Sequence, residues 1–295
     1  MVTIVAPIVI TQDDIIRFFK DNARDLPWRR PGTTPWGVLL SEVMSHQTPV
    51  GRVAPVWEKW IRRWPTPQDF AQASTDEVLR AWGTLGYPRR ALRLLQCAQV
   101  IVDKHGGEVP GDVDKLLALP GIGDYTARAV ACFAFGTNVP VVDTNVRRVY
   151  ARAVEGKFLA HPRAAERTNV AALLPRHNGP VFSAGLMELG AVVCTATKPK
   201  CPQCPLEKTC AWVSAGKPEP SAAELKRKKV QKFEGTDRQV RGKIMKCLRE
   251  APKPVPRSDI DLLWADQVQL SRALYSLLQD RLAEQDDKGY FHLPR

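Results

Sequence analysis

The chain has 295 residues, enough to bury a full core, and this length favours two domains. Its formal net charge of +12 favours a polyanionic partner, most simply nucleic acid, over a basic protein without such a partner. No apolar run reaches 18 residues, so a membrane-spanning helix is excluded and no membrane partner is expected. The apolar start at 2–10 lacks a preceding basic segment, and it predicts an arm or frayed terminus rather than a signal peptide.

From residue 12 to about 212 the sequence predicts an almost entirely helical region. Apolar residues recur at spacings of three and four, as in Val78, Leu79 and Trp82. Segments such as W-P-T-P and L-P-G-I-G mark turns, and no β-type alternation is evident. The composition then changes over 213–235, which holds the basic run 226–229 and predicts a linker. That run either keeps the linker solvated or follows a phosphate backbone.

The last sixty residues predict a separate small unit that begins with three helices. Apolar residues spaced by four between Val240 and Leu248 mark the first helix, which the proline-rich segment 252–256 ends. Ser258 is expected to cap a second helix over 260–263. Leucines between 270 and 278 mark the third helix.

A hairpin is expected to follow, with its turn at Asp286–Gly289. Three helices and a hairpin occur in this order in a winged helix, whose third helix enters the DNA major groove. Arg272 and Arg281 lie on the predicted third helix. Winged helices also bind proteins, so the partner of this unit stays open between DNA and protein.

Four of the seven cysteines lie close together, at Cys194, Cys201, Cys204 and Cys210. Their spacing, C-x6-C-x2-C-x5-C, favours metal binding in a reducing compartment over a disulfide framework. Structural zinc sites usually have two C-x2-C pairs, whereas a single pair with longer outer spacings suits a [4Fe–4S] cluster held by one loop. We therefore expect these thiolates to hold a [4Fe–4S] cluster that stabilises the fold and has no redox role. The remaining cysteines lie on helical patterns and are expected to be buried: Cys97, Cys132 and Cys247.

Two further segments hold candidate functional groups. The first reads as a helix, the turn L-P-G-I-G and a second helix, and Gly121 and Gly123 let backbone N–H groups approach a phosphate at a helix N-terminus. Asp143 follows, and an aspartate before a helical run is suited to cap it. The second segment, L-L-S-E-V-M-S-H-Q-T-P-V, places Glu42 among apolar residues. An apolar surrounding raises the pKa of a carboxyl group and suits a general acid.

In this order and at these separations, the motifs resemble the endonuclease III superfamily of base-excision DNA glycosylases. The resemblance covers residues 12–212 and is closest to the adenine DNA glycosylase (MutY) branch. It implies a mainly α helix-hairpin-helix glycosylase fold with a six-helix barrel and an Fe–S helical domain, to which this chain adds a small winged-helix-like α+β unit. In that superfamily the hairpin also holds a monovalent cation.

We expect five segments along the chain. They are an N-terminal arm and helix that pack on the Fe–S domain (1–24), the barrel with the helix-hairpin-helix (25–140), the [4Fe–4S] cluster domain (141–212), the basic linker (213–236) and the winged-helix-like domain (237–295). The last of these is too short to be the Nudix-like domain of the MutY branch.

The resemblance also implies residue roles. Glu42 would protonate the leaving base and activate water, while Asp143 would stabilise the sugar cation. Tyr125 stands where bifunctional members carry a Schiff-base lysine, so little or no strand cleavage is expected. The resemblance also implies that Asn145 belongs to the catalytic residues. The base pocket would contain Arg24, Trp28, Arg29, Ser45, His46 and Glu188. DNA contacts are expected at Gln47, Thr48, Tyr87, Pro88, Gly121, Gly123, Arg147, Lys198, Lys200 and Arg272.

The chain departs from the MutY pattern near the mispair. Ser45 and His46 replace a leucine and a glutamine, and Pro88 replaces the second tyrosine of the usual L-G-Y-Y motif. The expected function is hydrolysis of the N-glycosidic bond of a flipped adenine opposite guanine or 8-oxoguanine. One alternative is a glycosylase for hypoxanthine or another mispaired base, and another is a non-catalytic Fe–S DNA-binding regulator. We expect a monomeric, cytoplasmic, nucleoid-associated protein whose partner is double-stranded DNA with a mispair or damaged base.

Overall fold

The structure is a computed structural model that describes residues 10–159, 162, 164–220 and 233–295. Most of the predicted N-terminal arm and the basic run at 226–229 lie outside the described residues. The described part is mainly helical, and none of its helices is long and apolar enough to cross a membrane. The chain divides into two compact units, which are described separately.

The first unit comprises the described residues within 1–32, 111–114 and 123–229. Helix α7 (Val113–Leu117) begins in this unit and ends in the second. The remaining elements of the first unit are α1 (Gln12–Asn22), η1 (Pro27–Arg29), α8 (Asp124–Phe135), α9 (Thr144–Ala153), α10 (Glu166–Ala171), α11 (Gly179–Val192), η2 (Cys201–Gln203), η3 (Glu207–Thr209) and α12 (Ala211–Ser214).

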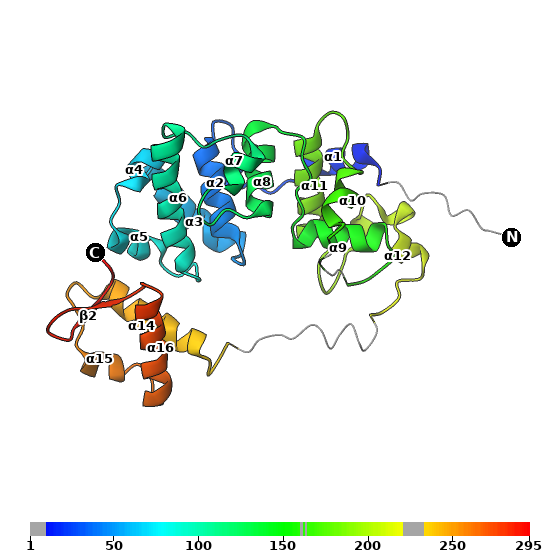
Figure 1. Ribbon diagram of the computed structural model, residues 1–295. Coiled ribbons are helices and arrows are strands. Elements are labelled where there is room, and N and C mark those ends of the chain that lie inside the picture. Colours follow the sequence, from blue (N-terminus) through cyan, green and yellow to red (C-terminus); the bar gives the residue numbers. More distant parts are fainter. Residues whose placement is uncertain (1–9, 160–161, 163, 221–232) are drawn as a thin grey trace. The chain divides into compact units, whose positions relative to one another are not determined.

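Helix α11 is the centre of the first unit, since it packs against both α1 and α9 (Figure 1). Two glycines allow this close packing. A Cβ atom on Gly185 would lie 2.7 Å from Cγ2 of Ile15, and one on Gly190 would lie 2.7 Å from Cβ of Asn145. Any larger residue would therefore push α1 or α9 away from α11.

The second unit comprises the described residues within 33–110, 115–122 and 230–295. Its helices are α2 (Pro35–Ser45), α3 (Val50–Arg63), α4 (Pro67–Ala71), α5 (Thr75–Trp82), α6 (Arg89–His105), α14 (Asp237–Glu250), α15 (Arg257–Asp261) and α16 (Gln267–Gln279), and its strands are β1 (Glu284–Gln285) and β2 (Phe291–His292). Aromatic rings fill part of its core. The Trp60 ring lies 5.0 to 5.6 Å from those of Trp64, Phe70 and Trp82, distances typical of favourable ring packing.

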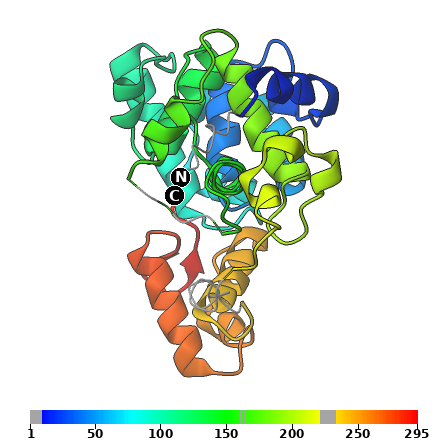
Figure 2. The same ribbon diagram turned by 90° about the vertical axis from the view of Figure 1, so that its right-hand side faces the viewer.

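Three helices and an antiparallel hairpin form the C-terminal part, in the order predicted from the sequence (Figure 2). The hairpin pairs Glu284 with His292 and Gln285 with Phe291, around the predicted turn. Phe291 also exchanges two 2.8 Å backbone hydrogen bonds with Val255, which ties the hairpin to the segment before α15.

Three local predictions were wrong. Ser258 does not cap α15, because the helix begins one residue earlier, after Pro256, whose lack of a backbone N–H suits a helix start. Arg281 lies beyond α16, at a φ of 54°, where the chain closes the helix end with a bond from the Leu282 N–H to the Leu277 carbonyl. Cys247 is only partly buried, whereas Cys97 and Cys132 are buried as predicted.

Candidate active site and cysteine pocket

Asp143 precedes α9 and caps it, as predicted. Its Oδ1 accepts hydrogen bonds from the backbone N–H groups of Asn145 (2.8 Å) and Val146 (2.7 Å), and its Oδ2 accepts one from Nδ2 of Asn145 (2.7 Å). Burial raises the pKa of Asp143, and these hydrogen bonds together with the charge of Arg148 only partly offset that effect. A fixed carboxyl group with a perturbed pKa is a candidate functional group.

Arg148 links the surroundings of Asp143 to the first cysteine. Its Nη2 donates to Oδ1 of Asn145 (2.7 Å) and to the carbonyl of Gly190 (2.5 Å), while its Nε donates to the carbonyl of Cys194 (2.7 Å). This arginine was not predicted from the sequence. The available signal was its spacing of four from Arg152, which places both arginines on one face of α9.

Three residues predicted for the base pocket form one ion-pair cluster in the first unit. Glu188 is fully buried on α11. Its Oε1 accepts from Nε of Arg24 (2.5 Å) and its Oε2 lies 2.9 Å from Nη2 of Arg29. Burial by itself raises the pKa of Glu188, but the hydrogen bonds and charges of the two arginines outweigh it and hold that pKa below its ordinary value. Trp28, also predicted for the pocket, is half-buried in η1.

We expect Glu188→Gln to lower the free energy of unfolding by about 3 kcal/mol, because it leaves two guanidinium groups without their shared counter-charge. The pKa of Glu188 is lower in the folded protein than in the unfolded chain. The stabilisation that its carboxylate provides is therefore present above the unfolded-state pKa and is lost as the pH falls through the folded-state pKa. Denaturant unfolding at several pH values measures both effects. Asp25→Asn, which breaks an exposed ion pair with Arg30, is the control and should change stability little.

Glu42 and Ser45 lie on α2, whose other residues from Trp36 to Met44 are buried. Thr34 caps the helix by accepting a hydrogen bond from the N–H of Gly37 (3.2 Å). Both Glu42 and Ser45 are half-buried, so each side chain lies at the border between the core and the surface. Glu42 belongs to the second unit and Asp143 to the first.

One half-buried arginine joins the two turns that hold most of the predicted mispair contacts. Nη1 of Arg90 donates to the carbonyl of His46 (2.6 Å), and Nη2 donates to Oγ1 of Thr48 (3.1 Å) and to the carbonyl of Gly86 (3.1 Å). Burial lowers the pKa of Arg90 to about 10. Burial also lowers the pKa of the His46 imidazole, and the positive charge of Arg90 adds to this effect.

Both turns contain an exposed residue in the left-handed region. The φ of Gln47 is 53° and that of Tyr87 is 48°, which is unfavourable for residues with a Cβ. Pro88 follows Tyr87 as the N-cap residue of α6. Gln47 and Tyr87 were predicted from the sequence as DNA contacts, but Arg90 was not, because an arginine in a helical run gives no signal of burial.

The helix-hairpin-helix is present as α7, a turn and α8. Gly121 has a φ of 78°, and a Cβ on it would lie 2.9 Å from Cβ of Arg93, so both its conformation and its surroundings require glycine. Gly123 is the N-cap residue of α8 and has open space around its Cα. Tyr125 is half-buried in the first turn of α8.

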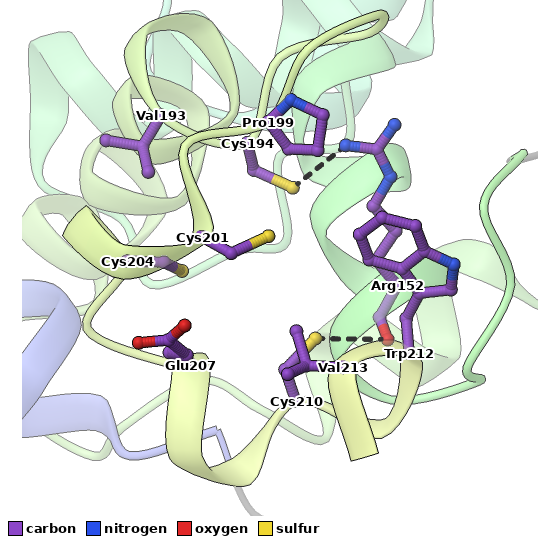
Figure 3. Close-up of a pocket in the computed structure, with 10 residues that line it drawn as sticks. All are labelled: Arg152, Val193, Cys194, Pro199, Cys201, Cys204, Glu207, Cys210, Trp212 and Val213. Carbon is purple, nitrogen blue, oxygen red and sulfur yellow. Dashed lines mark hydrogen bonds between the residues drawn. The ribbon is translucent and has the colours of Figure 1, made fainter. Parts of the chain in front are cut away.

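The four clustered cysteines line a single pocket, whose empty space including its open mouth is about 300 Å³ (Figure 3). All four are free thiols. Burial raises the pKa of Cys204 to about 12, while the N–H of Leu206 opposes this shift and the three neighbouring thiols add to it. Among the described residues, no group of three or more His, Cys, Asp or Glu side chains is arranged for a single metal ion.

Arg152 forms one wall of this pocket and is almost completely buried. Its Nη1 donates to Sγ of Cys194 (3.4 Å), as Figure 3 shows. The same nitrogen donates to the carbonyl of Thr195 (2.8 Å), and the guanidinium carbon lies 4.4 Å from the ring centroid of Phe158. A buried cation beside a sulfur stabilises the thiolate form. This residue was also missed from the sequence.

The remaining predicted DNA contacts differ in their surroundings. Lys198 and Lys200 are exposed on the loop between the first two cysteines. Arg147 is half-buried and makes a bidentate ion pair with Glu166, at 2.6 and 2.9 Å. Arg272 lies on α16, as predicted, and makes a bidentate ion pair with Asp237, at 2.7 and 2.8 Å. The roles of these residues stay predictions.

The comparisons with known proteins agree with this architecture. Residues 40–170 match the HhH-GPD superfamily of base excision DNA repair proteins. The structure resembles that of a thermostable thymine-DNA glycosylase, with a TM-score of 0.64 and 30% identity, over 69% of this chain and 95% of the other. It also resembles endonuclease III trapped in a covalent complex with DNA, with a TM-score of 0.60 and 27% identity, over 70% and 94% of the two chains.

The sequence is 54% identical to that of an adenine DNA glycosylase of Mycolicibacterium smegmatis, over 286 residues and 96% of each chain. Because the match covers 286 residues, it extends beyond the 12–212 region that carries the resemblance. The earlier resemblance and the mainly helical glycosylase fold are thereby confirmed. The chain belongs to the adenine DNA glycosylases, within the HhH-GPD superfamily of base excision DNA repair proteins.

Proposed function

We propose that the protein hydrolyses the N-glycosidic bond of an adenine mispaired with guanine or 8-oxoguanine in double-stranded DNA. The observation that carries this proposal is the 54% identity, over 96% of both chains, with a protein named adenine DNA glycosylase. The basic charge of the chain and the half-buried carboxyl group of Asp143, which caps α9 and has a raised pKa, support it. We further propose that the protein acts as a monomer, inside the cell and on nucleoid DNA.

In the proposed reaction, Glu42 donates a proton to the adenine ring as the bond between the base and C1′ of the sugar breaks. The bonding electrons leave with the base, and the sugar becomes an oxocarbenium-like cation. The Asp143 carboxylate stabilises that cation, since three hydrogen bonds fix its position. Glu42, now ionised, takes a proton from the water that adds to C1′. Tyr125 offers no amine for an imine, so the enzyme is monofunctional.

For base recognition we propose that Arg24, Trp28, Arg29 and Glu188 form one side of the adenine pocket, with Ser45 and His46 near the mispair. The ion pairs that hold Glu188 would make this pocket side rigid. The helix-hairpin-helix would bind a phosphate, with a monovalent cation at its turn. Lys198, Lys200, Arg147 and the C-terminal winged-helix-like unit would add phosphate contacts.

We propose that Cys194, Cys201, Cys204 and Cys210 hold a [4Fe–4S] cluster. Their free thiols line one pocket, in which the Arg152 guanidinium donates to Sγ of Cys194 and the backbone N–H groups of Trp212 and Val213 favour the thiolate of Cys210. These features fit a cluster with four thiolate ligands. Bound there, the cluster would cross-link the loop that follows α11, and we assign it no step in base removal.

Purified protein should contain about four iron atoms per chain and absorb broadly near 400 nm. Iron analysis and the visible spectrum of protein prepared without oxygen measure this. Cys204→Ser should reduce both signals, whereas Cys97→Ser, at a buried cysteine outside the pocket, should leave them unchanged. One zinc per chain without iron would contradict the assignment.

A second candidate is a glycosylase with a different base preference. Ser45, His46 and Pro88 favour it, because they differ from the MutY pattern at positions next to the mispair. Single-turnover excision from duplexes that vary both the target and the opposite base tests both candidates. The proposed function requires adenine to be the preferred target, with strand breaks that depend on added alkali. Preferred release of hypoxanthine would support the second candidate.

A further inference from the structure

The turn between α5 and α6 and the start of α14 bring together two exposed aromatic rings and a guanidinium group. The guanidinium carbon of Arg238 lies 4.5 Å from the ring centroid of Tyr87 and 5.9 Å from that of Phe233. Tyr87 is 42% exposed and Phe233 is 53% exposed. We call Tyr87, Phe233 and Arg238 the stacking cluster. All three residues belong to the second unit.

Tyr87 is held in place by its neighbours. Its φ of 48° is unfavourable for an aromatic residue, so the surrounding structure must fix it. Arg90 does so, since its Nη2 donates to the carbonyls of Leu85 (3.3 Å) and Gly86 (3.1 Å), and its guanidinium carbon lies 5.7 Å from the Tyr87 ring. Strained residues that are fixed in this way concentrate at functional sites.

Phe233 also has an ordered backbone. Oγ1 of Thr236 donates to the Phe233 carbonyl (2.7 Å), and the N–H of Gly235 donates to Oε1 of Gln239 (2.8 Å). The ring is therefore exposed although the backbone that carries it is tied to α14. An exposed ring on a fixed backbone contacts a partner at little cost in conformational entropy.

Packing also fixes α14 relative to Tyr87. Leu79 of α5 is buried in the core formed by the C-terminal helices. Nη1 of Arg80 donates to the carbonyl of Ala251 (3.2 Å), and Nη1 of Arg89 lies 3.1 Å from the Asp280 carboxylate. The helices on both sides of the Tyr87 turn thus bind the C-terminal part.

The stacking cluster lies beside the turn that ends the helix of Glu42. Arg90, which holds the Tyr87 turn, also binds the carbonyl of His46 (2.6 Å) and Oγ1 of Thr48 (3.1 Å). One side chain therefore connects the catalytic helix α2 to the cluster.

We propose that the stacking cluster binds the base that remains unpaired on the opposite strand when the target adenine is flipped out. This inference rests on the proposed function. Aromatic rings and guanidinium groups stack on the face of any nucleobase, and the positive charge attracts the DNA strand. A flipped target leaves its former partner without a pairing partner, so that base is free to stack on protein side chains.

The test measures binding to duplexes with an uncleavable 2′-fluoro-2′-deoxyadenosine target, by fluorescence anisotropy. The opposite position carries 8-oxoguanine, guanine or an abasic analogue. Phe233→Ala and Arg238→Ala should each weaken binding opposite a purine by about tenfold, because one base stack is lost. With the abasic analogue there is no base to stack, so Phe233→Ala should bind like the wild type, and Arg238→Ala should lose only the affinity that one positive charge contributes, as Arg62→Ala does. Arg238→Lys keeps the charge but not the planar group, so it should lose affinity opposite a purine and bind the abasic duplex like the wild type.

Two controls match the variants. Arg62→Ala removes an exposed positive charge from α3, and Tyr275→Ala removes another exposed ring, 62% exposed on α16. Neither should distinguish a purine from the abasic analogue. Equal losses on all duplexes for Phe233→Ala, or no loss for either variant, would overturn the proposal. Wild-type protein that fails to excise adenine would contradict the proposed function, which is a separate measurement.

Discussion

Glu42→Gln should lower the single-turnover rate of adenine excision by about 10²- to 10⁴-fold while DNA affinity stays within a few-fold of wild type. Glutamine keeps the shape of the half-buried side chain on α2. Its amide has no acidic proton to transfer to the leaving base and no carboxylate to take a proton from water. The measurements are excision under single-turnover conditions and binding to a duplex with an uncleavable adenine analogue.

Glu58→Gln is the matched control, since Glu58 is also a half-buried glutamate on a helix of the second unit. It should excise adenine at the wild-type rate. A near wild-type rate for Glu42→Gln would show that another group supplies the proton, and the proposed mechanism would then be wrong.

Asp143→Asn should lower the excision rate by about 10²- to 10³-fold, because it removes the negative charge that stabilises the sugar cation. Asparagine caps a helix about as well as aspartate, so α9 should keep its start. Asp266→Asn is the control, because Asp266 caps α16 with the same two backbone hydrogen bonds, both 3.0 Å, and has no proposed role in chemistry. Equal activity losses for both variants would indicate a structural effect.

The raised pKa of Asp143 has two consequences for pH dependence. The proposed mechanism requires the ionised form of Asp143. As the pH is lowered, the excision rate should therefore begin to fall at a higher pH than it would for an aspartate with the ordinary pKa of 3.8. Because the folded-state pKa lies above the unfolded value, the stability contribution of Asp143 is fully present below the unfolded pKa and is lost as the pH rises through the folded pKa. Asp143→Asn should therefore be at least as stable as wild type at neutral pH. Thermal melts and rate–pH profiles of both proteins measure these effects.

The spacing of motifs in the sequence was enough to predict the family, the helical fold and the grouping of the four cysteines. These features depend on short-range patterns. Apolar residues at helical spacing predict helices, and the tight turn of the hairpin requires glycine at position 121. The four cysteines lie within a segment of 17 residues, which is short enough for one loop to bring them together. The cap by Asp143 was predictable for the same reason, since its hydrogen-bond partners lie two and three residues away.

Only the tertiary structure revealed three arginines that pack inside the fold, one of them buried and two half-buried. Arg90, Arg148 and Arg152 appear in the sequence as ordinary basic positions on helices, yet each donates to carbonyl groups far along the chain. The contact of Arg238 with Tyr87 likewise joins residues that are 151 positions apart. Burial of a guanidinium depends on which carbonyls and rings the fold brings around it, and local sequence patterns do not encode that environment.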